Sequence, residues 1–179
     1  MSGVDLSLER LLFNLNTLAE LGEEITSPKD FTRVVKSSLY MVMGTFSASK
    51  GIVFQYDQGD GLFTQIASKG LSDVRGAGLK IGKDAATAII RNNKPVDLKS
   101  ADPIIALLGP GREFLERLGA RVLAFLIVKD ELLGLIAVSD KFSGEDYTLY
   151  EYKLLSVMGQ HISFSLHSHT LLMRLMYRY

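Results

Sequence analysis

The stretch 121–141, RVLAFLIVKDELLGLIAVSDK, most constrains what this chain can fold into. Two apolar runs, 122–128 and 132–138, flank the polar break Lys129-Asp130-Glu131, and each run is as long as a buried strand. Neither run alternates strictly between apolar and polar residues, which is typical of strands covered on both faces. The stretch therefore predicts an antiparallel hairpin at the centre of a sheet, with helices packed against it.

Length and composition limit the class of protein. The chain has 179 residues, 47% of them hydrophobic, which is enough for a single domain with a substantial core. Its 20 Lys and Arg residues balance its 20 Asp and Glu residues, so no overall field attracts nucleic acid or an acidic membrane. The absence of cysteine excludes disulfides, thiol nucleophiles and thiolate metal sites, and it fits a cytoplasmic protein. Because the chain shows no signal pattern and no apolar run of about 20 residues, we expect it to be soluble, without a membrane span.

Residues 6–44 predict two helices. In the first helix, apolar residues form two adjacent stripes, one of which repeats every seven residues. This pattern is either a single wide stripe that faces the core or a face for self-association, and both interpretations stay open. Ser27-Pro28 is typical of a helix start, and the second helix is expected to end at Gly44. The dimer residues predicted on the first helix are Leu8, Leu11, Leu15 and Leu18.

Residues 51–141 predict the sheet and its short connecting elements. The first two strands should form a hairpin at the edge of the sheet, because a cluster of turn-forming residues separates them. The glycine-rich segment 69–83 is either a mobile lip over a pocket or a plain turning connection. Asp84 is expected to cap the helix that follows. The predicted strands and short helices are, in chain order, 51–56, 62–68, 85–91, 96–98, 104–108 and 112–118.

Residues 146–179 predict one long C-terminal helix, again with two adjacent apolar stripes. A helix of this length runs past the edge of a small sheet, so its far end should be covered by a partner or by another domain. We expect a homodimer through parallel packing of the first and last helices, although the pattern alone does not decide between parallel and antiparallel packing. The dimer residues predicted on this helix are Leu154, Val157, Phe164 and Leu171.

Two stretches resemble motifs of the GAF domain, a cytoplasmic sensory module. The segments 81–86, IGKDAA, and 93–98, NKPVDL, look like the family's G-(E)-G-I-A … T-G-K-P-V-x-V-x-D pattern. The segment 118–138 looks like its L-G-I-R-S-L-L-x-V-P-L … L-G-V-L-x-L hairpin. The resemblance implies an α+β fold in one domain, 1–179, with a central antiparallel sheet of about five to six strands. It implies long N- and C-terminal helices on one face, and short helices and loops over a pocket on the other.

The resemblance also implies a small-molecule pocket between the sheet and the short helices. The alternative is that the same residues are ordinary core and the pocket is closed, because they would be apolar in either case. The residues that would form its walls are Phe54, Tyr56, Ile81, Ala85, Ile89, Ile104, Leu108, Phe114, Leu118, Leu123 and Phe125.

This chain lacks several residues that members of the family use for particular functions, and their absence argues against those functions. Bilin-binding members and the free methionine sulfoxide reductases of this fold use cysteines, which this chain lacks. Cyclic-nucleotide-binding members carry an NKxnFx3DE motif, whose nearest match here is Asp140-Lys141, then Tyr147 and Glu151, with Tyr152 in place of the final acid. Lys141 and Glu151 are still able to pair, but the missing asparagine and acid argue against nucleotide binding.

The residues offer little for catalysis or metal binding. The three histidines, His161, His167 and His169, lie on the last helix and are interpreted as helix-surface residues, so no metal site is predicted. We find no nucleophile–base pair and therefore expect no enzyme activity. A basic stripe with aromatic residues is also missing, so we expect no nucleic-acid binding.

These observations together predict a regulatory sensor domain that binds a small molecule, mediates dimerisation, or does both. A signal would pass through the terminal helices to a fused or separate output domain. The alternatives are a ligand-free dimerisation module of a larger regulator and a cyclic-nucleotide-binding domain. No cofactor and no particular ligand can be named from the sequence.

Overall fold

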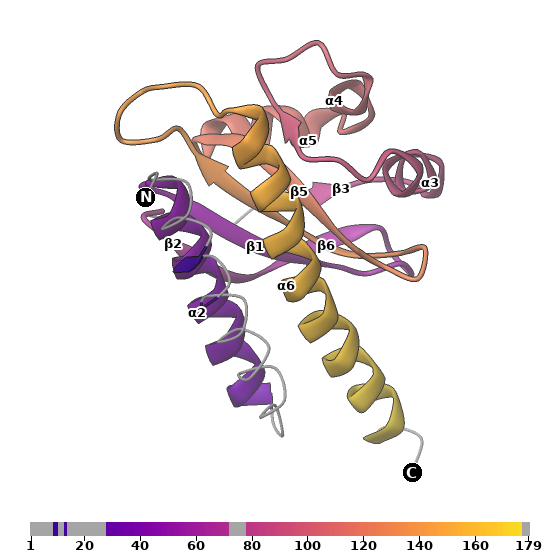
Figure 1. Ribbon diagram of the computed structural model, residues 1–179. Coiled ribbons are helices and arrows are strands. Elements are labelled where there is room, and N and C mark those ends of the chain that lie inside the picture. Colours follow the sequence, from indigo (N-terminus) through magenta and orange to yellow (C-terminus); the bar gives the residue numbers. More distant parts are fainter. Residues whose placement is uncertain (1–8, 11–12, 14–27, 72–77, 177–179) are drawn as a thin grey trace.

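A computed structural model describes residues 9–10, 13, 28–71 and 78–176. Within them, two long helices cover one face of a six-stranded antiparallel sheet, and three short helices cover the other (Figure 1). This is the α+β arrangement that the sequence predicts. Leu8, Leu11, Leu15 and Leu18 lie outside the described residues, so the dimer face proposed for the first helix stays a prediction.

The central hairpin consists of β5 (Ala120–Val128) and β6 (Glu131–Ser139), where the two apolar runs predict it. The strand order is β3-β2-β1-β6-β5-β4. The hairpin of β1 and β2 does not lie at the edge as predicted, because a strand in the glycine-rich segment, β3, pairs with β2 beyond it. The other strands are β1 (Gly51–Tyr56), β2 (Leu62–Lys69), β3 (Leu79–Lys80) and β4 (Val96–Asp97).

A two-residue turn closes the central hairpin. Lys129 and Asp130 have φ angles of 51° and 60°, the left-handed conformations that match the twist of the flanking strands. Glu131 pairs with Val128 and is the first residue of β6, so the predicted three-residue break is one residue too long.

The two long helices are α2 (Pro28–Phe46) and α6 (Leu149–Met176). Helix α2 does not end at Gly44 as predicted. Its left-handed stop comes at Ser47, whose φ is 54°, and the Ala48 N–H donates a hydrogen bond of 3.0 Å to the Met43 carbonyl. None of the described helices is long and apolar enough to cross a membrane.

The start of α6 is fixed by a reciprocal pair of hydrogen bonds. The Glu151 N–H donates to Thr148 Oγ1 at 3.1 Å, and the Thr148 N–H donates to Glu151 Oε1 at 2.9 Å. This capping box satisfies two backbone donors that the first turn would otherwise leave open. It places the first helical residue at Leu149, slightly later than predicted.

The short helices are α3 (Lys83–Asn92), α4 (Pro103–Leu107) and α5 (Pro110–Arg117). Asp84 does not cap α3 as predicted. Gly82 occupies the cap position without a side-chain bond, and Asp84 lies in the first turn, where a negative charge still favours the helix. Helix α4 does have a side-chain cap, because Asp102 accepts a hydrogen bond of 3.0 Å from the Ile104 N–H.

Successive residues of the central strands fill two separate cores. On β5, Val122, Ala124 and Leu126 belong to the core under α2 and α6. Leu123 and Phe125 belong to the core under α3, α4 and α5. The central hairpin thus has both faces covered, as the absence of strict alternation predicts.

Two glycines give a direct test of this packing. A Cβ atom on Gly134 would lie 2.1 Å from the Phe54 carbonyl oxygen of the neighbouring strand, whereas one on Gly44 would meet nothing within 4 Å. We expect Gly134→Ala to lower the free energy of unfolding by about 2–3 kcal/mol, because backbone must move. Gly44→Ala, inside α2, should raise it by about 0.5–1 kcal/mol. Urea denaturation measures both, and equal effects of the two substitutions would contradict the described strand contact.

Candidate functional site

The predicted pocket residues lie together. All eleven belong to or pack against one apolar cluster between the sheet and helices α3, α4 and α5, hereafter the α3–α5 cluster. Eight of them are buried, while Ala85, Phe114 and Leu118 are partly exposed at its margin. The sequence therefore placed these side chains on the correct face, and ligand binding among them stays a prediction.

The α3–α5 cluster is almost wholly apolar. Tyr56 is the only titratable side chain among its described members. Burial, assisted by the charges of Asp57 and Asp60, raises the pKa of Tyr56. None of the buried polar or charged side chains in the described residues belongs to this cluster; they are Ser38, Arg121, Ser139 and Ser163. Apolar contact would thus dominate the recognition of any molecule bound here.

A β-bulge places Arg121 beside this cluster. Ala120 pairs with Ser139 and Val122 pairs with Val138, so Arg121 is the additional residue in β5. Bulges of this kind change the direction of a side chain. The arginine is only 7% exposed, and a buried cation requires compensating charge.

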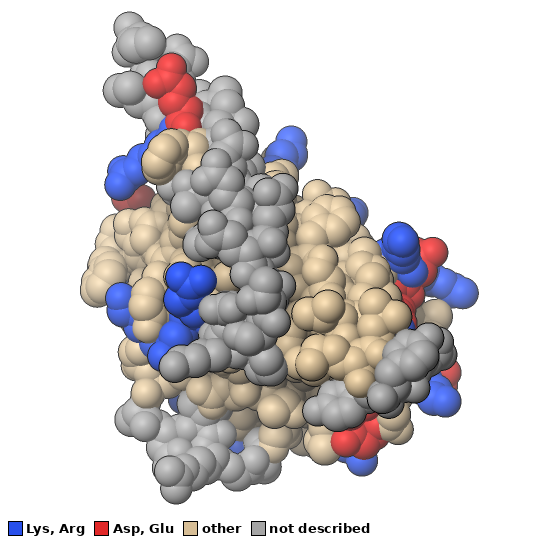
Figure 2. Space-filling model, turned by 90° about the horizontal axis from the view of Figure 1, so that it is seen from below, with Lys and Arg blue, Asp and Glu red and all other residues tan. Residues whose placement is uncertain are grey.

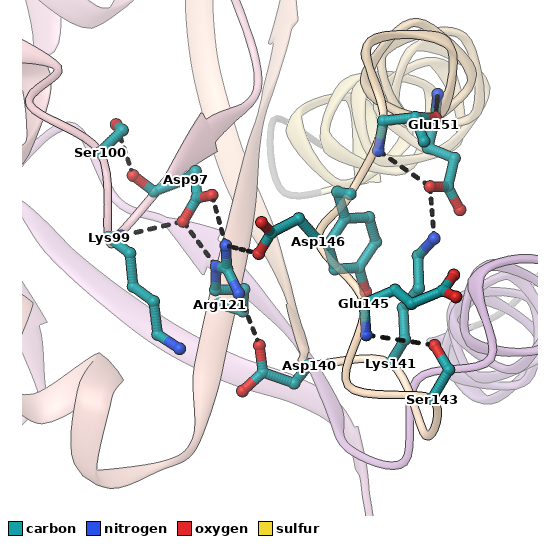
Figure 3. A network of polar contacts seen from close by, with 12 residues as sticks. Asp97, Lys99, Ser100, Arg121, Asp140, Lys141, Ser143, Glu145, Asp146 and Glu151 are labelled. Atoms are coloured by element: carbon teal, nitrogen blue, oxygen red, sulfur yellow. Dashed lines mark hydrogen bonds and ion pairs between the residues drawn. The ribbon is translucent and has the colours of Figure 1, made fainter.

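Three carboxylates from different segments supply that charge (Figure 3). Asp97 of β4 accepts two hydrogen bonds, from Arg121 Nε at 2.7 Å and from Nη2 at 2.9 Å. Asp140, directly after β6, accepts one from Nη1 at 2.9 Å, and Asp146, shortly before α6, accepts one from Nη2 at 2.9 Å. One guanidinium therefore joins the edge strand, the central hairpin and the segment that leads into α6.

The network also reaches α6 directly. The Tyr152 hydroxyl donates a hydrogen bond of 3.1 Å to Asp97 Oδ2. Burial and the charge of Asp97 raise the pKa of Tyr152 to about 12. Burial acts to raise the pKa of Asp97, but hydrogen bonds from Arg121, the Lys99 N–H and Tyr152 outweigh it and hold this pKa below its ordinary value. Asp97 is therefore ionised at neutral pH and holds two elements together.

A second ion pair fixes the segment before α6. Lys141 Nζ pairs with Glu151, as the sequence allows, and their side chains are 12% and 17% exposed. The hydroxyl of Tyr147 donates to the Ser139 carbonyl at 2.8 Å. Burial opposes ionisation of Glu151, but hydrogen bonds from Lys141 and Thr148 hold its pKa below the ordinary value. The start of α6 is thus tied to the sheet from two sides.

Helix α6 turns only part of its apolar surface toward the protein. Four large side chains, Leu155, Met158, Ile162 and Leu166, are buried in the core under α2 and α6. The predicted dimer residues lie on a neighbouring side of the helix. Leu154 packs partly against the core, and the others are exposed: Val157 by 39%, Phe164 by 59% and Leu171 by 44%.

The histidines of α6 are less exposed than predicted. All three are partly buried, and the ring of His169 stacks on that of Phe31 in α2 with centroids 3.8 Å apart. The interpretation as a helix-surface residue is therefore wrong for His169, which packs between the two long helices. Burial lowers its pKa. Among the described residues, no group of three or more His, Asp or Glu side chains is placed to hold a metal ion.

An open groove of about 520 Å³ lies between the sheet and the C-terminal half of α6. Polar and apolar surface line it in about equal shares, and Arg174 of α6 reaches Glu131 of β6 at 3.7 Å across it. This groove could not be predicted from the sequence, because its walls come from segments that are far apart in the chain. They include Gln55, Asp57, Thr64, Leu133 and Thr170.

Sequence reasoning missed the Arg121 network for the same reason. Asp97, Asp140 and Asp146 are 24, 19 and 25 residues from Arg121, so no local spacing connects them. Asp97 in particular lies in a short extended segment, 96–98, where the sequence alone assigns its carboxylate no partner. The available signal was a single arginine at the start of an otherwise apolar strand, since such a residue needs partners when the strand is buried.

No protein-family model and no curated protein matches this sequence. Solved structures do match it. The GAF domain of a phosphoenolpyruvate-protein phosphotransferase from Coxiella burnetii has a TM-score of 0.65 at 16% identity, over 90% of this chain and 95% of that chain. The PixJ GAF domain of Thermosynechococcus elongatus, in its blue-light absorbing form, has a TM-score of 0.61 at 14% identity, over 86% and 96%.

This chain has a GAF-like fold. A far-red absorbing dark-state structure with bound biliverdin is also similar, with a TM-score of 0.62 at 13% identity over 86% of this chain and 97% of that chain. In the GAF-like domain, the two sequence motifs fall on α3 with β4 and on the central hairpin. The resemblance in sequence and the similarity in structure thus concern the same elements.

The first prediction for the candidate site of this GAF-like domain concerns Arg121. We expect Arg121→Met to lower the free energy of unfolding by about 3–5 kcal/mol, because it leaves the Asp97 carboxylate half-buried without its cation. The matched control is Arg112→Met, which breaks an exposed pair with Glu116 on α5 and should cost less than about 0.5 kcal/mol. Urea denaturation at neutral pH measures both, and a similar small cost for both variants would contradict the account of the network.

The second prediction concerns the loss of stability at acidic pH. Asp97 and Glu151 have pKa values below their ordinary 3.8 and 4.5, so their stabilising effect is complete above that range and is lost as the pH falls through the lowered values. The double variant Asp97→Asn/Glu151→Gln should be less stable at pH 7 and lose less stability between about pH 4.5 and 2. Thermal unfolding across this range measures the slope, and an unchanged slope would rule out these two carboxylates as its source.

Proposed function

We propose that this GAF-like domain is a regulatory, non-catalytic sensor that binds a small, mainly apolar molecule in the α3–α5 cluster and passes its state to α6. The observation that carries the proposal is the Arg121 network. It connects the edge strand of the cluster with the segment before the long helix and with Tyr152 in the first turn of that helix, through hydrogen bonds to the guanidinium of Arg121 and to the carboxylate of Asp97.

The proposed route has two steps. Val96 and Leu98, on either side of Asp97, are buried members of the α3–α5 cluster. A molecule that enters the cluster would displace these two side chains and with them β4, a strand of only two residues. The Asp97 carboxylate would move with the strand, and its bonds to Arg121 and to Tyr152 of α6 would change. The equilibrium position of α6 would shift to the extent that the molecule binds one arrangement better than the other.

Two comparisons support a ligand and a signalling role. The biliverdin-bound structure shows that a similar fold holds a small-molecule chromophore, and the PixJ domain is described in a blue-light absorbing form. This chain has no cysteine, so a bound molecule would be held without a thioether bond.

The third prediction tests ligand binding. We expect a thermal-shift and native mass spectrometry screen with haem, biliverdin, nucleotides, amino acids and 2-oxo acids to favour the mainly apolar compounds. Ala85→Leu, which fills the margin of the cluster on α3, should weaken a hit at least tenfold. Ala106→Leu, an exposed position on α4, should leave it unchanged. An affinity that is the same for Ala85→Leu as for the unmodified chain would overturn the proposed site.

One alternative function has a specific observation in its favour. The ion pair of Lys141 with Glu151 matches part of the motif of cyclic-nucleotide-binding members of the family. Tyr152, in the place of the motif's last acid, instead donates to Asp97. Selective stabilisation by cyclic nucleotides in the same screen would favour this alternative. No binding at all would favour a ligand-free dimerisation module.

A further inference from the structure

The groove of about 520 Å³ between the sheet and the C-terminal half of α6 has the size of a ligand site, since small-molecule pockets occupy about 300–1,000 Å³. It lies where the turn after β1 and the turn after β5 come next to each other (Figure 1). Gln55 of β1, Thr64 of β2 and Leu133 of β6 contribute to its floor, and Thr170 and Arg174 of α6 form a wall. The α3–α5 cluster lies mainly on the other face of the sheet. The groove is therefore a candidate for a second binding site.

A β-bulge shapes the floor of this groove. On β6, Leu132 pairs with Ile127 of β5, whereas Gly134 pairs with Leu126, so Leu133 is an additional residue between the two pairs. Bulges of this kind change the direction of a side chain. Leu132 belongs to the α3–α5 cluster, but Leu133 belongs to the core under α2 and α6. The groove thus has an apolar patch on its floor beside its polar walls.

Charged groups of both signs line the groove. Arg174 and Glu131 form an ion pair at 3.7 Å, beyond hydrogen-bond distance, and their side chains are 59% and 31% exposed. Such a pair contributes little to stability. Among the described residues, no acceptor lies within hydrogen-bond distance of the Arg174 guanidinium, so its donors are open to a ligand. Asp57, in the turn after β1, adds a second carboxylate to the lining.

We propose that this groove binds a free α-amino acid with a basic side chain, such as arginine. The α-carboxylate would pair with Arg174, because a planar guanidinium matches a carboxylate through two parallel hydrogen bonds. The α-ammonium would pair with Glu131, which lies beside Arg174. Two carboxylates and one cation are the charged groups in the described lining, so a ligand with two positive groups and one negative group balances them. The second positive group of the ligand would lie toward Asp57.

The surface at this end of the molecule agrees with such a ligand. Figure 2, which views the molecule from below, shows acidic and basic side chains close together at the margin and mainly uncharged surface between them. A molecule that carries both charges and a carbon chain matches this mixture.

The inference does not rest on ligand binding in the α3–α5 cluster, but it extends the role proposed for α6. Arg174 lies in the last turn of α6, in the half of the helix that runs past the edge of the sheet (Figure 1). An amino acid bound between Arg174, Glu131 and Asp57 would connect this half with the ends of two hairpins. It would therefore stabilise one position of the helix relative to the sheet.

Isothermal titration calorimetry with L-arginine tests the groove. We expect the unmodified chain to bind L-arginine at least tenfold more tightly than agmatine, which lacks the carboxylate, or N-acetyl-arginine, which lacks the free ammonium group. Arg174→Gln should weaken the binding of L-arginine at least tenfold and that of agmatine much less, because agmatine has no carboxylate to lose a partner. The matched control is Arg112→Gln, an exposed arginine on α5, which should bind L-arginine as the unmodified chain does.

Four results would overturn the proposal. They are no binding of L-arginine, an equal affinity of Arg174→Gln and the unmodified chain, equal affinities for L-arginine and L-glutamate, and loss of L-arginine binding in Ala85→Leu. The last result would place the amino acid in the α3–α5 cluster. The apolar compounds are titrated separately into the same proteins. If they bind the unmodified chain and L-arginine does not, the groove proposal fails while the proposed sensor function stands.

Discussion

The salt bridge between Arg121 and Asp97 is the interaction on which the rest of this structure depends. A β-bulge directs the side chain of Arg121 toward the edge of the core. Its charge would be costly to bury there, and the carboxylates of Asp97, Asp140 and Asp146 compensate it. Those carboxylates come from the edge strand, the end of the central hairpin and the segment before α6. Arg121 pairs with all three carboxylates only when the three segments keep their relative positions. The ion pairs therefore influence the arrangement of these segments as well as the stability of the fold.

This constraint matters because the sheet separates two cores, one under α2 and α6 and the other under the short helices. Alternation along β5 and β6 sends one set of side chains under α2 and α6 and the other under the short helices. Apolar contacts have no preferred direction, so the side chains on either face of the sheet can shift slightly against each other without breaking a specific interaction. A charge-assisted hydrogen bond is stronger and more specific in geometry, which suits the role proposed above for Arg121 as the link between β4 and α6.

Much of the fold could be predicted from the sequence. The apolar runs of the central hairpin are long and have a distinct pattern, and both strands form where these runs predict them. The end of helix α2 and the short strand β3 were predicted less well. Gly44 was mistaken for a helix end because the real stop is Ser47, a residue that seldom adopts a left-handed conformation. The strand β3 was missed because its two residues lie among glycines and are defined only by pairing with β2.

The candidate site, too, could be predicted only in part from the sequence. The apolar wall residues could be assigned to one face, since the resemblance to the GAF family selects them. The network of Arg121 could not, because its partners meet only after the edge strand and the segment before α6 fold onto the hairpin. The exposed line on α6 was visible in the sequence, but only the structure separates it from the adjacent buried side of that helix.

The most direct test of the central claim is amide hydrogen exchange in the first two turns of α6, measured in a double-mutant cycle. Leu98→Ala perturbs the α3–α5 cluster next to Asp97, and Arg121→Met removes the link. We predict that Leu98→Ala speeds exchange at the start of α6 in the unmodified background and has little further effect when Arg121→Met is already present. An equal increase in both backgrounds would contradict the account, because the perturbation would then reach α6 by a route that does not involve Arg121.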